Sequence, residues 1–254
     1  MNPKLIHTIS QMNTDFYRAV SDSFSATRQS PWNGWKQLGV FFEEYHHSSS
    51  LKILDIACGN LRFEEFLTSA LPSKNLAFTC IDNCESLLPE NYAQNISFHQ
   101  TDVMYALEHQ KALLSEDKRF DISVSFGFMH HIPTQEMRLT LLNLLIEHTK
   151  PGGLVVVSFW QFANLETMKT KALKTTKKAL QQLRKTVEIT DLDENDYFLG
   201  WKDTEGIYRY CHHFSDEELT LLAKSVLDRA TLIKRFLADG RNNQLNAYLV
   251  FKKK

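Results

Sequence analysis

The sequence predicts an α/β fold with a seven-stranded sheet, in which five parallel strands are closed by a C-terminal antiparallel hairpin and helices cover both faces. Three observations predict it. Apolar runs of strand length alternate with segments of helical periodicity between residues 51 and 160. That alternation is typical of right-handed crossovers between parallel strands. Two further strand-like runs, joined by a turn that begins with Asp-Gly, end the chain. One domain, 1–254, is expected.

Two helices are expected before the first strand. Residues 4–24 and 33–47 carry apolar side chains at mixed three- and four-residue spacing, which is a helical pattern. Between them lies the segment "FSATRQSPWNGW", residues 24–35, which contains Arg28 and two tryptophans. We interpret residues 1–47 as a helical lid over a binding site.

The central part of the chain, residues 48–160, is expected to hold the parallel strands and a cofactor. The strand runs are "LKILDIA", "LAFTCID", "ISFHQTD", "FDISVSFGF" and "LVVVSFW". The helical segments that follow the first four are "NLRFEEFLTSAL", "CESLLPENY", "VMYALEHQKALL" and "TQEMRLTLLNLLIEHT". Strands that alternate with helices of this length favour a parallel sheet.

The rest of the chain divides into an insertion and a closing unit. Residues 161–215 are interpreted as a substrate cap, and residues 216–254 as a helix followed by the hairpin "ATLIKRFLA" and "NAYLVFK". Within the cap, residues 168–185 hold seven Lys or Arg and no acid. This run is either a solvated helix or a surface that faces RNA, and the sequence leaves both open.

Composition limits the function classes. The chain is 43% apolar and 23% charged, with a net charge of −1, which excludes a globally basic nucleic-acid-binding protein. No apolar run reaches the ~18 residues of a membrane span, and the first residues lack the features of a signal peptide. Four cysteines without CxxC spacing indicate a reducing, cytoplasmic location.

Acidic residues mark the ends of three successive strands. In doubly wound sheets, ligands bind beyond the carboxyl ends of the strands. The first of these ends, "LDIACGNLRF", has only Gly59 where a dinucleotide fingerprint needs three glycines. Asp55, Asp82 and Asp102 instead suit a cationic amine, a ribose diol and an adenine amine. The alternative is that these acids are only helix N-caps and turn residues.

The same motifs resemble the class I, Rossmann-like methyltransferases that use S-adenosylmethionine. The matching segments are "LDIACGN", "CID", "QTDV" and "KPGGLVVVSFW". The resemblance implies S-adenosylmethionine as the cofactor, with the methionine part near Asp55, the ribose near Asp82 and the adenine near Asp102. The full set implied to bind it is Asp55, Ala57, Gly59, Asn60, Asp82, Asn83, Asp102, Val103, Phe126 and Gly127. The family usually has glycine where Ala57 and Leu61 stand, so Leu61 predicts a less open loop.

Three other segments are similar to the methyltransferases that esterify carboxymethylated wobble uridine in tRNA. These are "FSATRQSPWNGW", "FGFMHHIPTQEMR" and "GWKDTEGIYRYCHHF". The resemblance runs from about Tyr17 to Leu219, except for an insertion near residues 164–196, and Gly200 and Cys211 depart from it. It implies a tRNA carboxylate as the methyl acceptor. In eukaryotes this group works with a small zinc-binding activator protein, so such a partner is open for this chain.

A carboxylate acceptor sets simple chemical requirements. It is ionised at neutral pH and needs no general base, but it must be oriented for in-line attack. Arg28 or Arg209 is expected to orient it, with His130, His131 and His212 as hydrogen-bonding neighbours. Arg28 has a second interpretation, in which it holds the methionine carboxylate of the cofactor. A methyltransferase acting on a small carboxylic or phenolic metabolite, and a non-catalytic cofactor-binding or partner subunit, remain the alternative functions.

Paired histidines raise the question of a metal ion. The chain has His-His at positions 46–47, 130–131 and 212–213. Adjacent side chains on a strand or helix point apart, so a shared ion is not expected and no metal site is predicted.

Overall fold

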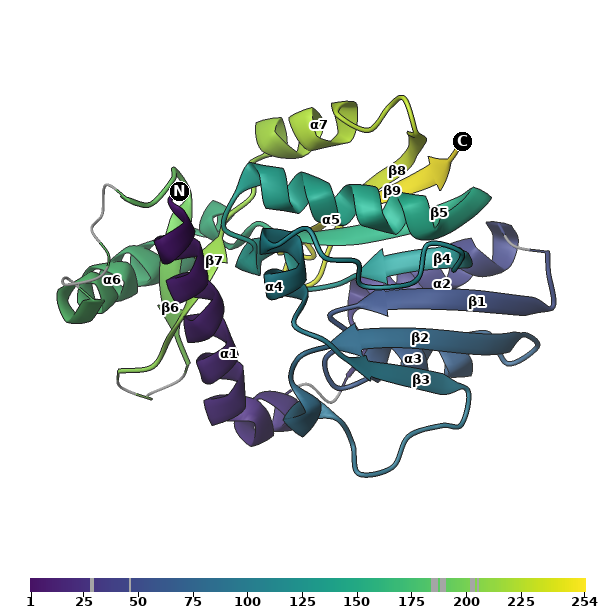
Figure 1. The fold of residues 1–254 in the computed structure, drawn as a ribbon, viewed down its shortest axis with the longest axis horizontal. Coiled ribbons are helices and arrows are strands. Elements are labelled where there is room, and N and C mark those ends of the chain that lie inside the picture. Colours follow the sequence, from purple (N-terminus) through teal and green to yellow (C-terminus); the bar gives the residue numbers. More distant parts are fainter. Residues whose placement is uncertain (28–29, 46, 184–186, 188–190, 202–203, 205) are drawn as a thin grey trace.

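The structure is a computed structural model that describes residues 1–27, 30–45, 47–183, 187, 191–201, 204 and 206–254. Its main sheet has seven strands in the order β3-β2-β1-β4-β5-β9-β8 (Figure 1). The bounds are β1 Ser50–Ile56, β2 Asn75–Asp82, β3 Ile96–Gln100, β4 Phe120–Ser125, β5 Thr149–Trp160, β8 Ala230–Ala238 and β9 Asn246–Lys253. Strands β1 to β5 pair in parallel, and β9 runs antiparallel to β5 and β8. The predicted fold class is confirmed.

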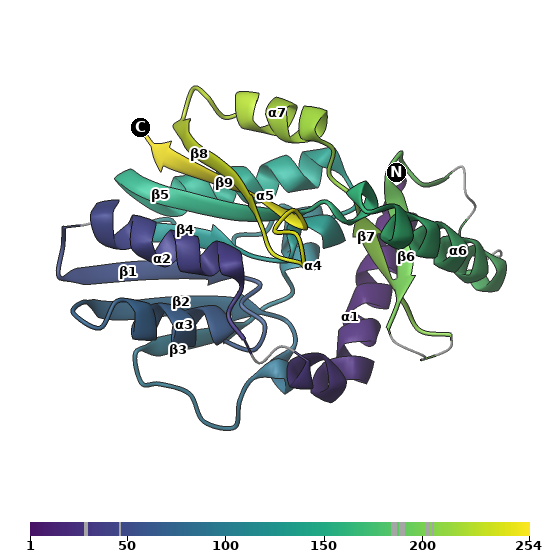
Figure 2. The same ribbon diagram turned by 180° about the vertical axis from the view of Figure 1, so that it is seen from behind.

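Helices cover both faces of this sheet (Figures 1 and 2). One apolar core joins the strands to α4 Val103–Glu108, α5 Gln135–His148 and α7 Asp216–Lys224. A second core on the opposite face joins them to α2 Asn33–Tyr45 and α3 Arg62–Ala70. Because both faces are covered, the central strands are apolar without alternation, as expected for a parallel sheet.

Two of the expected helices are much shorter in the structure. After β2 only a 3-10 turn forms, η1 Glu85–Leu87. Pro89 follows it, and a proline disfavours helical backbone in the residue before it. After β3, α4 ends at Glu108, and Gln110 then takes a left-handed φ of 51°. The apolar periodicity predicted their positions but not these local terminations.

The insertion at residues 161–215, interpreted from the sequence as a substrate cap, contains a small sheet of its own. Strands β6 Asp196–Gly200 and β7 Tyr208–His212 form an antiparallel pair, flanked by α6 Glu166–Leu183 and by α1 Pro3–Ala26. Phe198 and Tyr210 of this pair pack in one apolar cluster with residues of α1 and α6. In Figure 1 these elements lie together beyond the carboxyl ends of β1 and β2.

Two further 3-10 turns, η2 Met129–His131 and η3 Phe162–Asn164, follow β4 and β5 on the side of the cap. The helices in the described part of the chain are all too short or too polar to cross a bilayer.

Candidate functional site

A cavity of about 470 Å³ lies at the carboxyl ends of the parallel strands, between the sheet, α1 and the cap. This is where a doubly wound sheet is expected to bind its ligand. Every residue predicted to bind the cofactor lines the cavity except Asp102. Of the residues predicted to act on the acceptor, His130, His131 and Arg209 line it, His212 does not, and Arg28 lies outside the described residues.

Asp102 is a helix N-cap, which is the alternative role stated above for the acids at the strand ends. Its carboxylate accepts the backbone N–H of Tyr105 at 2.9 Å, and it forms the N-cap of α4. The residue is exposed, whereas the next residue, Val103, is buried and lines the cavity. The structure therefore brings Val103, and not Asp102, to the position where adenine is expected.

Asp82 closes the floor of the cavity at the end of β2. Its two carboxylate oxygens accept the backbone N–H groups of Gly59 and Cys84, each at 2.9 Å. Burial raises the pKa of Asp82, although these backbone hydrogen bonds act in the opposite direction. Each oxygen keeps a second lone pair that can accept a ligand hydroxyl.

The loop after β1 has three left-handed residues, and only one of them is a glycine. Ala57 and Leu61 have φ values of 65° and 60°, and Gly59 has 59°. The left-handed conformation costs an L-residue about 1–2 kcal/mol. Leu61 is only 3% exposed and packs in the core beneath α2, outside the cavity lining. The expected narrowing of the loop by Leu61 is therefore not found.

Leu61→Gly is expected to lower the free energy of unfolding by about 2 kcal/mol, because the lost burial outweighs the relief of strain. Ala57→Gly is the matched control, since Ala57 is small and its loss leaves almost no cavity. We expect that variant to stay within about 1 kcal/mol of the wild type. Urea unfolding measures both, and a more stable Leu61→Gly protein would show that strain dominates at this position.

The segment before α2 forms part of the cavity wall. Trp32 stacks on Trp35 with ring centroids 4.9 Å apart, and both line the cavity. Between them, Gly34 lies against the Tyr248 ring so closely that an added Cβ would be 2.2 Å from it. Its N–H donates to Asp239 at 3.0 Å. The tryptophans are thus both packing residues and cavity walls.

A chain of hydrogen bonds joins α1, η2 and the cap at one wall of the cavity. Arg209 donates to the Tyr17 hydroxyl at 2.7 Å, and that hydroxyl lies 2.7 Å from His131 Nε2. His131 Nδ1 lies 2.9 Å from the Tyr210 carbonyl oxygen, which can only accept, so Nδ1 carries the proton. Burial, together with the charge of Arg209, lowers the pKa of His131 to about 3, so the ring is neutral at neutral pH.

Arg209 is a buried cation without an acidic partner among the residues that the structure describes. It is 7% exposed, and its Nε is buried with no hydrogen-bond partner. Its guanidinium carbon lies 5.0 Å from the ring centre of Phe16 and 5.6 Å from that of Trp160. The side chain is held in place by aromatic rings, and its charge faces the cavity uncompensated.

His212 has a different position from the one that the sequence suggested. Its Nδ1 lies 2.7 Å from Asp196, and its Nε2 lies 2.8 Å from Glu218. Both ring nitrogens are therefore engaged by carboxylates, which hold the ring between the two acids. Burial would raise the pKa of Glu218, but the hydrogen bond and charge of His212, with Arg138, lower it. His212 therefore links the cap to α7, away from the cavity.

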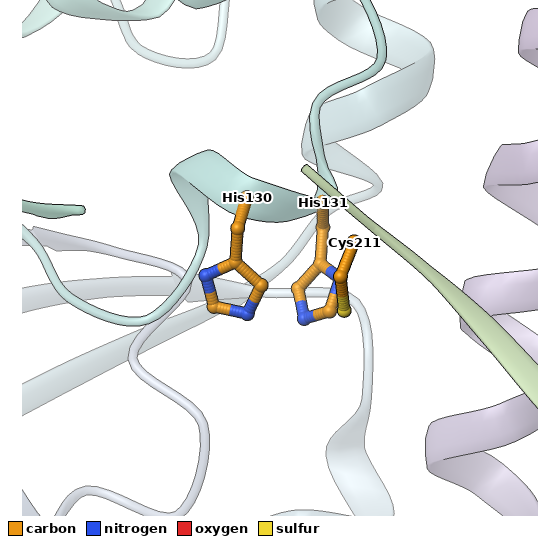
Figure 3. Close-up of side chains that lie close together, drawn as sticks. All are labelled: His130, His131 and Cys211. Carbon is orange, nitrogen blue, oxygen red and sulfur yellow. The ribbon is translucent and has the colours of Figure 1, made fainter. Parts of the chain in front are cut away.

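The His130–His131 pair does not follow the expectation that adjacent side chains point apart. They lie on the 3-10 turn η2, and their ring centres are only 4.1 Å apart. Figure 3 shows the His131 ring between the His130 ring and Cys211, and ligand atoms of the three residues lie within 4.8 Å of one another. The Nδ1–H of His131 is already donated, and burial raises the pKa of Cys211 to about 12, which keeps the thiol protonated. The absence of a metal stays a prediction.

Two residues of α1 that sequence reasoning did not single out help to build the site. Tyr17 bridges Arg209 and His131, and Asn13 accepts the N–H of Tyr210 at 2.7 Å while it lines the cavity. Both lie in an ordinary amphipathic pattern, so their types alone carry no signal. Only the packing of α1 against β7 gives them these partners.

The central part of the chain is similar to a known protein family. Residues 54–155 match the family model described as "Methyltransferase domain". This chain has a methyltransferase domain, of the class that uses S-adenosylmethionine. Over its whole length, the methyltransferase superimposes on the Burkholderia thailandensis 1,6-didemethyltoxoflavin-N1-methyltransferase, crystallised with S-adenosylhomocysteine, with a TM-score of 0.63. That match covers 100% of this chain and 92% of the other at 14% identity, which supports the fold.

Two similar sequences belong to tRNA-modifying enzymes. One is the tRNA (carboxymethyluridine(34)-5-O)-methyltransferase of Arabidopsis thaliana, 25% identical over 57% of this chain. The other is the Xenopus tropicalis enzyme of the same description, 24% identical over 63% of this chain. The match spans only 31% and 23% of these longer proteins.

The cavity of the methyltransferase fits S-adenosylmethionine, which supplies an electrophilic methyl group on a sulfonium. Its volume is in the range of small-molecule sites. Asp82 can accept the ribose hydroxyls. Asp55 is 2% exposed, and its Oδ1 has no hydrogen-bond donor among the described residues, which suits the amino group of the cofactor. Neither acid forms an ion pair with a described Lys, Arg or His.

Proposed function

We propose that this methyltransferase transfers the methyl group to a carboxylate, and that the carboxylate belongs to a modified wobble uridine in tRNA. The observation that carries the proposal is Arg209. A buried guanidinium without a counter-ion is costly, and an anionic substrate would remove that cost. Arg209 reaches the same cavity as the residues that fit the cofactor. A carboxylate held there is placed for in-line attack on the methyl group.

The hydrogen-bond chain around Arg209 agrees with an acceptor that needs no general base. A phenol or amine acceptor must lose a proton, and a histidine is the usual group to take it. The Nε2 of His131, the basic nitrogen of its ring, already accepts the Tyr17 hydroxyl. His131 thereby orients Tyr17, which in turn positions Arg209. A carboxylate acceptor is ionised already.

The choice of tRNA is supported by the two tRNA-modifying relatives and by the three segments that resemble them. All three segments contribute side chains to the cavity. "PWNGW" contributes Trp32 and Trp35, "IYRYCHHF" contributes Arg209, and "FGFMHHIPTQEMR" contributes His130 and His131. Arg28 retains both of its interpretations, as a contact to the carboxylate of the substrate or to that of the cofactor.

Labelled methyl transfer to bulk tRNA tests the proposal, with tRNA from cells that lack the activity. We expect label in a uridine nucleoside, released as methanol by mild alkali because the product is an ester. Unlabelled tRNA together with measurable binding of S-adenosylhomocysteine would instead support a small-metabolite acceptor. No cofactor binding would support a non-catalytic subunit. Activity of the isolated chain would show that no activator protein is needed.

We propose helix α6 as the surface that holds the tRNA backbone. Its lysines are exposed and form no ion pair within the described part of the chain: Lys169, Lys171, Lys174, Lys177 and Lys178. The only acid of the helix is Glu166 in its first turn. The helix follows Trp160, a cavity residue, by way of η3. Exposed lysines without counter-ions match a polyanion by charge.

The triple substitution of Lys171, Lys174 and Lys178 by glutamine is expected to weaken tRNA binding about tenfold at 100 mM salt. It should also lower the slope of log K against log salt concentration by about 2 to 3. A control triple of Lys52, Lys118 and Lys224 removes the same charge from exposed positions outside the cap. Filter binding at several salt concentrations gives both quantities, and equal losses in the two triples would contradict a role for α6.

A further inference from the structure

Two carboxyl groups lie side by side beneath the cofactor end of the cavity. Asp55 belongs to β1 and is 2% exposed, and Glu64 belongs to α3 and is 0% exposed. Asp55 lies directly opposite Cys80 in the pairing of β1 with β2, and the Cys80 thiol contacts Glu64, so the two carboxyl groups are close neighbours. Asp55 lines the cavity, whereas Glu64 lies behind it and accepts the Cys80 thiol at 3.1 Å.

One oxygen on each carboxyl group has no other donor. Asp55 Oδ1 and Glu64 Oε2 are buried, and neither has a hydrogen-bond donor among the described residues. Ionised carboxylates only accept, so these two groups can bond to each other only when one carries a proton. Among the residues that the structure describes, the titratable groups that act on the pair are Cys58, Cys80 and Asp82, and none of these is a cation.

The electrostatic surroundings support a shared proton. Burial, and then the nearby Glu64, raise the pKa of Asp55 well above its usual value. Burial also raises the pKa of Glu64, although the thiol of Cys80 acts in the opposite direction. A cation beside Asp55 would reverse this balance, because it favours the ionised form.

We propose that Asp55 and Glu64 share one proton in the free enzyme and release it when the amino group of the methyl donor binds against Asp55. Glu64 is a positioning residue here, since it acts through Asp55 and does not line the cavity. The proton that held the two carboxyl groups together goes to the solvent, and the cationic amino group replaces it as the partner of Asp55. The inference depends on the cofactor and not on the acceptor.

Calorimetry with S-adenosylhomocysteine tests this on the wild-type protein, in two buffers of different ionisation enthalpy at neutral pH. We expect release of on the order of one proton per cofactor, and an affinity that rises with pH up to about tenfold per unit. 5′-Methylthioadenosine lacks the amino-acid part and is expected to bind without proton release. No release with S-adenosylhomocysteine would overturn the proposal. Equal release with both ligands would do so too, because it would assign the proton to Asp82.

Substitution of Glu64, the second carboxyl group of the pair, provides an independent test. In Glu64→Gln, an amide donates to Asp55 without adding a like charge, so we expect less than half of the proton release and a flatter pH dependence of affinity. Glu65→Gln, one residue along α3 and exposed, is the matched control and should behave as the wild type. Wild-type release in Glu64→Gln would remove Glu64 from the pair. Cofactor binding with these properties but unlabelled tRNA would overturn only the proposed acceptor.

Discussion

Arg209→Gln is expected to lower kcat/KM for the carboxylate acceptor by about 100-fold, which corresponds to about 2.7 kcal/mol of transition-state stabilisation. The guanidinium supplies paired N–H donors and a positive charge in a water-poor cavity, and glutamine supplies neither the charge nor the fork. Arg209→Lys keeps the charge but loses the planar fork and its contacts with Phe16 and Trp160. We therefore expect an intermediate loss for lysine.

Binding of S-adenosylhomocysteine separates this role from a structural one. Both Arg209 variants should bind the cofactor product within about threefold of the wild type, because Asp55 and Asp82 lie elsewhere in the cavity. Unchanged turnover in both variants would remove Arg209 from the acceptor site. A loss confined to cofactor affinity would instead assign Arg209 to the methionine carboxylate.

Acidification should destabilise the protein through His131. In the unfolded chain this ring takes up a proton near its usual pKa of 6.5, whereas burial lowers the folded pKa to about 3. Between these values the unfolded state binds more protons, so stability falls as the pH falls, by at most about 1.4 kcal/mol per unit. His131→Asn keeps a donor for the Tyr210 carbonyl but cannot titrate. The loss in free energy of unfolding that this variant shows relative to the wild type should therefore be about 2 kcal/mol smaller at pH 5 than at pH 8.

Urea unfolding at a series of pH values measures this difference directly. Subtracting the two proteins cancels the other titrating groups, including His213, whose pKa is lowered to about 4 by burial. His47→Asn, at an exposed position, is the control for a histidine replaced away from this site. A destabilisation by His131→Asn that stays constant across the range would mean that the folded protein protonates His131 as readily as the unfolded chain does.

The five parallel strands, the closing hairpin and the cofactor end of the site could be predicted from local pattern. Apolar runs such as "LKILDIA" and "LVVVSFW" are long enough to be buried strands, and their alternation with helices determines the parallel arrangement. The turn after β1 illustrates the limit of that reasoning. Leu61 differs in type from the glycine of the resembling family, yet its backbone is left-handed and its side chain is buried in a core. That core consists of residues distant in the sequence.

The set of side chains at the acceptor end of the cavity depends on tertiary contacts, which no local sequence pattern encodes. The sequence predicts that His130, His131, Arg209 and His212 act together, but the structure separates His212 from the others by pairing it with Asp196 and Glu218. The sequence also predicts that Asp102 acts with Asp55 and Asp82, but Asp102 caps a helix at the surface. In each case the residue type permits both roles, and the neighbours decide between them.

The sequence by itself determined the α/β class, the seven strands of the main sheet and the acids at the ends of β1 and β2, because these follow from hydrophobic periodicity and from motifs within single strand-turn-helix units. Only the tertiary structure decided which side chains face the cavity. The docking of α1 on the β6–β7 hairpin buries Arg209 away from any acid of the described residues and joins Tyr17 to His131. The packing of α3 on the sheet places Glu64 behind Asp55. Long-range packing determines how deeply each of these side chains is buried and which groups it contacts. Burial and contacts in turn determine the charge that each side chain carries.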